Sequence, residues 1–204
     1  MLLNLTGYHG LISRKLEYKN PIVLIISVKN VFFHDQFLYI QTVKLIDVDF
    51  CFIWEDLAYK NGPIISPNMF KKFIFPFLKR YIASLKKVGV QNFIVDTDGN
   101  FEVLIDLFTK AGVNGFEPFE IQAGMDIEKI RDLYPDLIII GGIDKIALSK
   151  GKKNIEMEIN KVKRMINIGR FIPTTDHAVP PDVSFENYCF FRNELKKVIR
   201  NRDS

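Results

Sequence analysis

The stretch NFIVDTDGN, residues 92–100, runs from an apolar segment into two carboxylates and a glycine. The run Phe93-Ile94-Val95 predicts a buried strand, and Asp96 and Asp98 follow it two positions apart. Side chains two apart on a strand point the same way, so both carboxylates are expected on one face at the strand's carboxyl end. From these residues alone, the pattern fits either a functional site or a turn.

Short apolar runs alternate with longer amphipathic segments from residue 49 onward, which is typical of β/α units around a parallel sheet. The expected fold class is therefore α/β. We expect strands at 50–54, 92–95, 115–119, 137–140 and 171–174, and helices at 67–88, 101–110, 127–133, 155–168 and 185–200. Pro76 predicts a kink or an interruption in the first helix. The apolar run 23–28 fits either a strand or part of a buried helix.

Composition excludes several classes of protein. The 204 residues are 48% hydrophobic, enough for a substantial core in one or two domains. The 28 basic and 24 acidic residues are intermixed, so no nucleic-acid-binding stripe is expected. No apolar run approaches the ~18 residues of a membrane span, and the N-terminus lacks the pattern of a signal peptide. Two cysteines without a paired framework indicate a reducing compartment, and we expect a cytoplasmic protein.

Acids or histidine follow every expected strand. In parallel β/α folds the carboxyl ends of the strands form one mouth, so these side chains are expected to converge on a common cavity. Any one of the acids, taken alone, is more typical of a turn or a helix cap. Five consecutive strand ends favour a site. The side chains concerned are Glu55, Asp56, Asp96, Asp98, Glu117, Glu120, Asp144, Asp176 and His177.

His177 has three interpretations at this level. It fits a hydrogen-bonded loop histidine with no chemical role. It also fits a ligand for zinc or another divalent ion, together with the carboxylates of Asp96, Asp98 and Glu120. A third interpretation is an acid/base group, because an imidazole with a pKa near ~6.5 exchanges protons close to neutral pH. The sequence leaves these three roles open.

Five ordered segments resemble the uroporphyrinogen decarboxylase (URO-D) superfamily, which includes the corrinoid-dependent methyltransferases. They are FIWEDLAYKNGPIISPNMFKKFIFPFLKRYI, VDTDGN, GFEPFEIQAGMDIEKIRDLYP, IIIGGIDKIAL and FIPTTDHAVPPDVSFENY. The resemblance implies a TIM-type (β/α)8 barrel with its site in the mouth. Such a barrel needs ~250 residues, so 48–204 is expected to form roughly its last five β/α units, after a poorly matched segment 1–47.

The resemblance also implies site residues. Decarboxylases of the superfamily carry Gly-His-Gly near the last strand, and the zinc methyltransferases carry a cysteine there and His-x-Cys on an earlier strand. In this chain His177 takes the last-strand position and Asp96-Thr97-Asp98 takes the earlier one. Oxygen and nitrogen donors make a harder Lewis acid than thiolates do. The expectation is a methyltransferase or demethylase with a divalent metal, zinc above others, at Asp96, Asp98, Glu120 and His177, and with catalytic roles for His177, Asp98 and Glu55.

Two alternatives stay open. The first is uroporphyrinogen decarboxylase activity in porphyrin biosynthesis, which in the family uses arginines and an aspartate from the missing first part of the barrel. The second is an inactive partial barrel that acts as an interaction subunit. The expected partners are a small-molecule substrate, a corrinoid protein, a chain that completes the barrel, or a second copy. Four arginines at helix-like positions are expected to be solvated rather than to bind substrate: Arg80, Arg131, Arg164 and Arg170.

Overall fold

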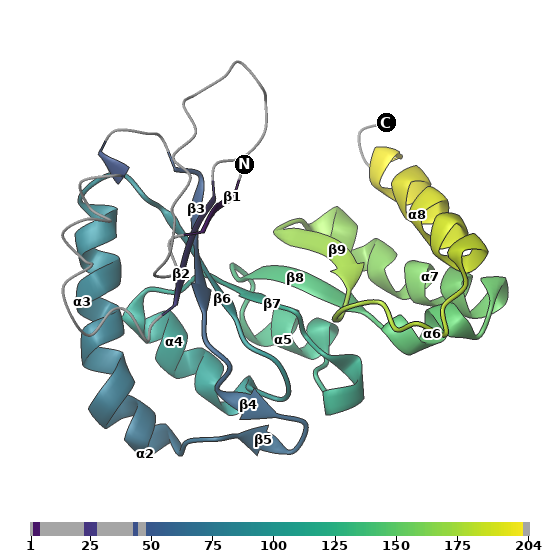
Figure 1. Cartoon of the computed structure of the whole chain (residues 1–204). Helices are drawn as coiled ribbons and strands as arrows, with labels where there is room; N and C mark the ends of the chain where they lie inside the picture. The colour runs from purple at the N-terminus through teal and green to yellow at the C-terminus, as the bar shows by residue number, and fades with distance from the viewer. Residues whose placement is uncertain (1, 5–22, 28–42, 45–47, 202–204) are drawn as a thin grey trace.

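The computed structural model describes residues 2–4, 23–27, 43–44 and 48–201. Its main feature is a seven-stranded parallel sheet whose strand order follows the chain (Figure 1). In order these are β1 (Leu2–Asn4), β2 (Val23–Ser27), β3 (Phe50–Trp54), β6 (Asn92–Asp96), β7 (Gly115–Glu117), β8 (Ile138–Ile143) and β9 (Phe171–Thr175). From β3 onward, each connection between neighbouring strands of this sheet contains at least one helix, as in a β/α barrel. Most of the segment 1–47 lies outside the described residues, although its run 23–27 is a strand.

The expected helix 67–88 is interrupted, as Pro76 predicted. Its first turn is α2 (Pro67–Met69), where the hydroxyl of Ser66 accepts a hydrogen bond from the amide of Met69 at 3.2 Å. A π-helical turn η2 (Phe70–Ile74) follows, and α3 (Phe75–Lys86) continues from there. Proline has no N–H to donate to the preceding turn, so the break falls beside Pro76.

The remaining helices are η3 (Glu102–Leu104), α4 (Ile105–Ala111), η4 (Ile121–Ala123), α5 (Ile127–Leu133), α6 (Lys145–Ser149), α7 (Lys152–Ile168) and α8 (Phe185–Arg200). The α5 and α8 bounds match the sequence prediction. α7 begins three residues earlier than predicted, and α6 and the hairpin of β4 (Ala58–Tyr59) and β5 (Gly62–Pro63) were not predicted. Within the described ranges, no helix has the length and apolarity that crossing a membrane requires.

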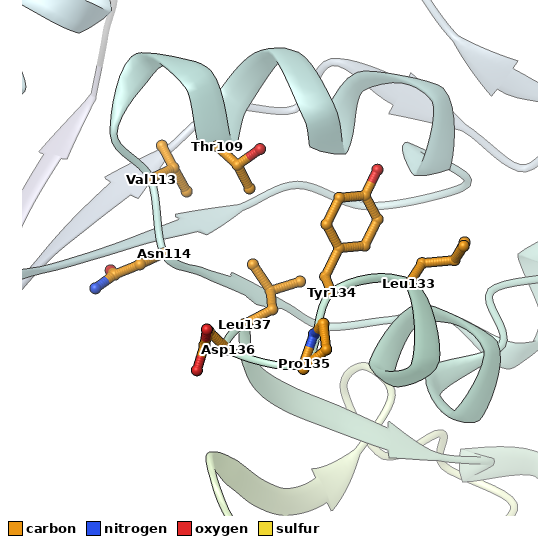
Figure 2. Close-up of a pocket in the computed structure, with 8 residues that line it drawn as sticks. All are labelled: Thr109, Val113, Asn114, Leu133, Tyr134, Pro135, Asp136 and Leu137. Carbon is orange, nitrogen blue, oxygen red and sulfur yellow. The ribbon is translucent and has the colours of Figure 1, made fainter.

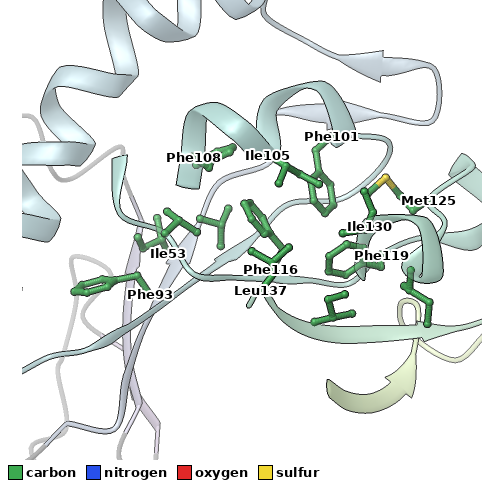
Figure 3. Close-up of a cluster of buried hydrophobic side chains, with 14 of the residues drawn as sticks. Ile53, Phe93, Phe101, Ile105, Phe108, Phe116, Phe119, Met125, Ile130 and Leu137 are labelled. Atoms are coloured by element: carbon green, nitrogen blue, oxygen red, sulfur yellow. The ribbon is translucent and has the colours of Figure 1, made fainter. Parts of the chain in front are cut away.

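A phenylalanine-rich core fills the space between one face of the sheet and helices α3, α4 and α5 (Figure 3). The rings of Phe101 and Phe116 stack with their centroids 5.2 Å apart. Phe70 and Phe108 meet edge to face at 4.6 Å. Paired aromatic rings of this kind contribute about 0.5–1.5 kcal/mol beyond their burial. This layer fixes the strands on which the site is built.

The opposite face of the sheet is much more open. On β3, Cys51 and Ile53 are fully buried on the helix side, but Trp54 is 49% exposed. Ile172 on β9, which is the edge strand of the described sheet, is 53% exposed. In a closed barrel this face would be the packed interior. The described part of the chain therefore forms an open section of a barrel wall.

Candidate active site

Strand pairing places an aromatic ring and two carboxylates in one row. Trp54 on β3 is in register with Asp96 on β6, and Asp96 is in register with Glu117 on β7. Residues in register on neighbouring strands lie about 4.8 Å apart and point to the same face. The carboxylates of Asp96 and Glu117 are therefore neighbours on the open face, at the carboxyl ends of their strands.

A pocket of about 410 Å³ lies at these strand ends. Its walls come from the ends of β3, β6 and β7, from β8, and from the end of β9 and the loop after it. Asp96, Asp98 and His177, which lie far apart in the sequence, meet around it. The lining residues are Trp54, Asp56, Asp96, Asp98, Glu117, Pro118, Ile140, Thr174, Thr175, His177 and Ala178.

His177 and Asp98 form a pair across this pocket. Nε2 of His177 lies 3.4 Å from Oδ2 of Asp98, and the two side chains are 41% and 42% exposed. The backbone amide of Asp98 also donates to Oδ1 of Asp56 at 3.5 Å. A carboxylate at this distance from an imidazole nitrogen orients the ring, and both groups here remain open to a bound molecule.

Gly99 lies in the turn after β6, and this turn also helps to build the site. Its φ is +74°, and a Cβ there would lie 2.5 Å from the backbone carbonyl carbon of Tyr59. Only glycine fits a left-handed position with the chain so close. The glycine therefore brings the β6 loop against the β4–β5 hairpin, and Asp98 is held at the pocket by that approach.

The carboxyl groups of Asp96 and Glu117 both have raised pKa values. Burial raises the pKa of Glu117 to about 7, and the nearby charges of Asp96 and Asp98 add to the effect. Burial also raises the pKa of Asp96 to about 6, with contributions from Asp98 and Asp56 and an opposing one from His177. Two carboxyls that titrate near neutral pH beside an imidazole can give and accept protons in this pocket.

The expected metal ligand Glu120 lies outside the pocket lining. Its Oε1 atom lies 2.9 Å from the ammonium of Lys145, and its Oε2 atom accepts a hydrogen bond from the amide of Gly99 at 2.9 Å. Among the residues that the structure describes, no group of three or more His, Cys, Asp or Glu side chains is arranged to hold a metal ion. Of the four expected ligands, Asp96, Asp98 and His177 line the pocket and Glu120 does not.

Glu55, the third expected catalytic residue, does not line the pocket either. Its backbone amide donates to the carbonyl of Asp96 at 2.8 Å, and its sequence neighbour Asp56 lines the pocket instead. Glu117 and Trp54 also line the pocket; the sequence analysis named Glu117 among the acids at the strand ends but gave neither residue a role. Their alignment with Asp96 depends on strand register.

The prediction that Arg131 is solvated was wrong. Only 3% of this residue is exposed, and its guanidinium donates to four backbone carbonyls, those of Pro135, Leu137, Gly169 and Arg170, at 2.7 to 3.3 Å. It joins the chain before β8 to the chain before β9 and contacts no part of the pocket. Arg80, Arg164 and Arg170 are exposed, as predicted.

A second pocket, of about 330 Å³, lies at the other rim of the sheet, where β7 and β8 begin (Figure 2). Residues 109–114 and 133–137 form its walls, with the ring of Tyr134 and the side chains of Leu133 and Leu137 among them. Asp136 is its one carboxylate among the described lining residues. This pocket lacks the acid/base grouping of the first, so we place the candidate active site at the carboxyl rim.

Comparison with known proteins gives the family. Among solved structures, the chain is similar to a methyltransferase from Methanosarcina mazei, with a TM-score of 0.58 and 15% identity over 90% of this chain and 59% of that one. The chain thus spans 59% of the length of this neighbour, and the likeness shows a shared fold, part of a TIM-type barrel. No curated protein matches the sequence. The sequence model described as "Uroporphyrinogen decarboxylase (URO-D)" matches residues 41–198, and the chain therefore belongs to the uroporphyrinogen decarboxylase (URO-D) family.

Proposed function

We propose that this chain carries the acid/base site of a methyltransferase or demethylase of the corrinoid-dependent type. The observation that supports this most is the charge of the pocket at the carboxyl rim. Four carboxylates and one imidazole line it, and no lysine or arginine is among the described lining residues. Such a lining suits a neutral or cationic substrate, and the exposed face of Trp54 adds an aromatic surface that attracts cations.

The chemistry follows from what a leaving group needs. When a methyl group passes from an oxygen or nitrogen atom to a nucleophile, the C–O or C–N bond breaks and the heteroatom keeps the electron pair. A proton delivered to that heteroatom stabilises it. Glu117, with a pKa of about 7, and Asp96, with a pKa of about 6, can supply that proton, and the pair of His177 and Asp98 lies in the same pocket.

Decarboxylation of uroporphyrinogen is the second candidate, and the family description favours it. A polycarboxylated tetrapyrrole would bring several negative charges against Asp56 and Asp98, and against the other two carboxyl groups whenever they are ionised. Two like charges 4 Å apart repel by about 1 kcal/mol in water and about 4 kcal/mol near a protein surface. The described pocket offers no cation to offset this repulsion, so we favour methyl transfer.

The test uses free cobalamin in place of a corrinoid protein. Purified protein is mixed with chemically reduced cobalamin and a panel of methylated amines and methyl ethers, and methylcobalamin is followed by absorbance. We expect formation above the protein-free rate for at least one donor, and loss of that excess in His177→Gln. Carbon dioxide release from uroporphyrinogen without methylcobalamin formation would favour decarboxylation. Inactivity in both assays would favour the interaction-subunit alternative.

The metal and the partners stay predictions. Metal content is checked on protein purified without chelator, alongside Asp98→Ala and His177→Ala. A stoichiometric ion that both variants lose would place a metal between these two side chains, and equal content in all three proteins would remove it from the proposal. Sedimentation in an ultracentrifuge checks for self-association or a completing chain through the exposed face that includes Ile172. We propose a cytoplasmic location on the two free cysteines, Cys51 and Cys189.

A further inference from the structure

Lys145, at the start of α6, lies outside the pocket at the centre of a charged network. Its ammonium Nζ atom lies 2.9 Å from Oε1 of Glu120 and 4.0 Å from Oδ1 of Asp176. Only 15% of the lysine side chain is exposed, and Asp176 is fully buried. Lysine is rarely covered to this extent unless it is paired, so these two carboxylates explain its position.

The same two carboxylates also bind the backbone of the loops around them. Glu120 accepts from the amide of Gly99 at 2.9 Å. Asp176 accepts from the amide of Ile121 at 2.8 Å and from that of Lys145 at 2.9 Å. The network therefore connects the loops that follow β6, β7 and β8 with the end of β9.

Charge explains why the network needs a cation. Burial acts against the ionised form of Glu120, but hydrogen bonds from Lys145 and Gly99 hold its pKa below the usual range. Burial raises the pKa of Asp176, and the hydrogen bonds from the amides of Lys145 and Ile121 oppose that rise. Without the ammonium, the two carboxylates would lose the cation that lies between them, which is strongly unfavourable in a partly buried site.

The network ends beside the pair that faces the pocket. Gly99, which binds Glu120, directly follows Asp98, and Asp176 directly precedes His177. We propose that Lys145 is a positioning residue that holds Asp98 and His177 in contact, because it keeps Glu120 and Asp176 together. The catalytic meaning of this contact rests on the proposed function, but the contact itself does not.

The test measures the NMR signals of the imidazole ring of His177, so it needs no substrate. Long-range proton–nitrogen NMR spectra are recorded for every variant at the same alkaline pH. The chain has three histidines, and the spectrum of His177→Gln identifies the ring signals of interest. Asp98→Ala supplies the shift that loss of the contact produces. Lys145→Met is then compared with it.

We expect Lys145→Met to move the His177 signals in the same direction as Asp98→Ala and by at least half as much, and Lys145→Arg to restore most of the original spectrum. Arg131→Met is the matched control, since it removes another buried cation and lowers stability at the opposite rim. A shift in Lys145→Met no larger than that in Arg131→Met would overturn the proposal. Should Lys145→Met fail to fold, Glu120→Gln breaks the same ion pair and is judged by the same criterion.

Discussion

The two rims of the sheet differ in the side chains that their loops bring together. At the carboxyl rim, four carboxylates and an imidazole surround an open pocket, and two of the carboxyls have raised pKa values. At the amino rim, the strands β7 and β8 border an apolar pocket, and the buried guanidinium of Arg131 binds four backbone carbonyls. The carboxyl rim brings like charges together, but at the amino rim the two terminal nitrogens of the Arg131 guanidinium donate to four backbone carbonyls.

This difference separates function from stability within one sheet. Groups that titrate near neutral pH are useful to a reaction and costly to a fold, because burial and like charges work against their ionised form. A buried guanidinium that donates to backbone carbonyls of two segments has the opposite character, since it holds those segments together and exchanges no proton near neutral pH. Changes at the carboxyl rim should therefore alter activity, and changes at the amino rim should alter stability.

The largest effect is expected at the amino rim. Arg131→Met would remove a donor from four carbonyls, of which that of Arg170 still accepts from the amide of Ile139 at 3.0 Å, so we expect the free energy of unfolding to fall by about 3–5 kcal/mol. Urea denaturation followed by circular dichroism measures this change. Arg164→Met is the control, because Arg164 is exposed in its ion pairs and should contribute less than about 1 kcal/mol. Equal losses in both variants would contradict the structural role of Arg131.

A smaller effect, on activity, is expected at the carboxyl rim. Glu117→Gln keeps the shape of the side chain but removes its exchangeable proton, so we expect the rate of methyl transfer to fall about 100-fold. The stability of this variant should equal or exceed that of the unchanged protein at pH 8. Tyr134→Phe, at the apolar pocket of the other rim, serves as the control with an unchanged rate. A Glu117→Gln variant with full activity would exclude this carboxyl as the proton donor.

The carboxyl groups at the carboxyl rim should also make the stability of the protein depend on pH. The pKa of Glu117 is about 7 against an ordinary 4.5, and that of Asp96 is about 6 against 3.8. Because these folded-state values are raised, the contribution to stability is complete below about pH 4 and is lost as pH rises through 6 and 7. Allowing for screening by solvent, we expect a loss on the order of 1–2 kcal/mol between pH 4 and pH 8.

Urea denaturation at several pH values checks this expectation. The difference between the unchanged protein and Glu117→Gln is the informative quantity, since other titrating groups contribute equally to both. That difference should grow in favour of Glu117→Gln as pH rises through 7. A difference that is constant with pH would show that Glu117 has an ordinary pKa in the folded protein.

The sequence predicted the parts of this comparison that depend on local patterns. Strand β3 and helices α5 and α8 have the predicted bounds, because apolar alternation and cap residues such as Ser184 are properties of neighbouring positions. The meeting of Asp98 and His177 could also be predicted, since carboxyl ends of parallel strands share one rim. Proline chemistry explains the interruption of the helix near Pro76 and the early end of β7 before Pro118.

The rest depends on contacts between distant segments. The row of Trp54, Asp96 and Glu117 follows from strand register, which apolar runs buried on both faces leave unspecified. Lys145 and Arg131 look like ordinary helix charges in the sequence, and only the carboxylates and carbonyls that surround them show their burial. The sequence prediction selected Glu55 and Glu120 by position after a strand, but the structure places their neighbours Asp56 and Glu117 at the pocket.

The smallest effect is predicted for Asp126, an acid near the carboxyl rim that we expect to contribute to stability and not to catalysis. Asp126 accepts hydrogen bonds from the amides of Glu128 and Lys129 at 3.0 and 3.1 Å and caps α5. We expect Asp126→Ala to lower the free energy of unfolding by about 1 kcal/mol, with the same rate of methyl transfer at saturating donor. Asp126→Asn, which keeps the cap acceptor, should restore the stability. A loss of activity in Asp126→Ala without a loss of stability would mean that the chemistry extends beyond the pocket, and the division between the two rims would then fail.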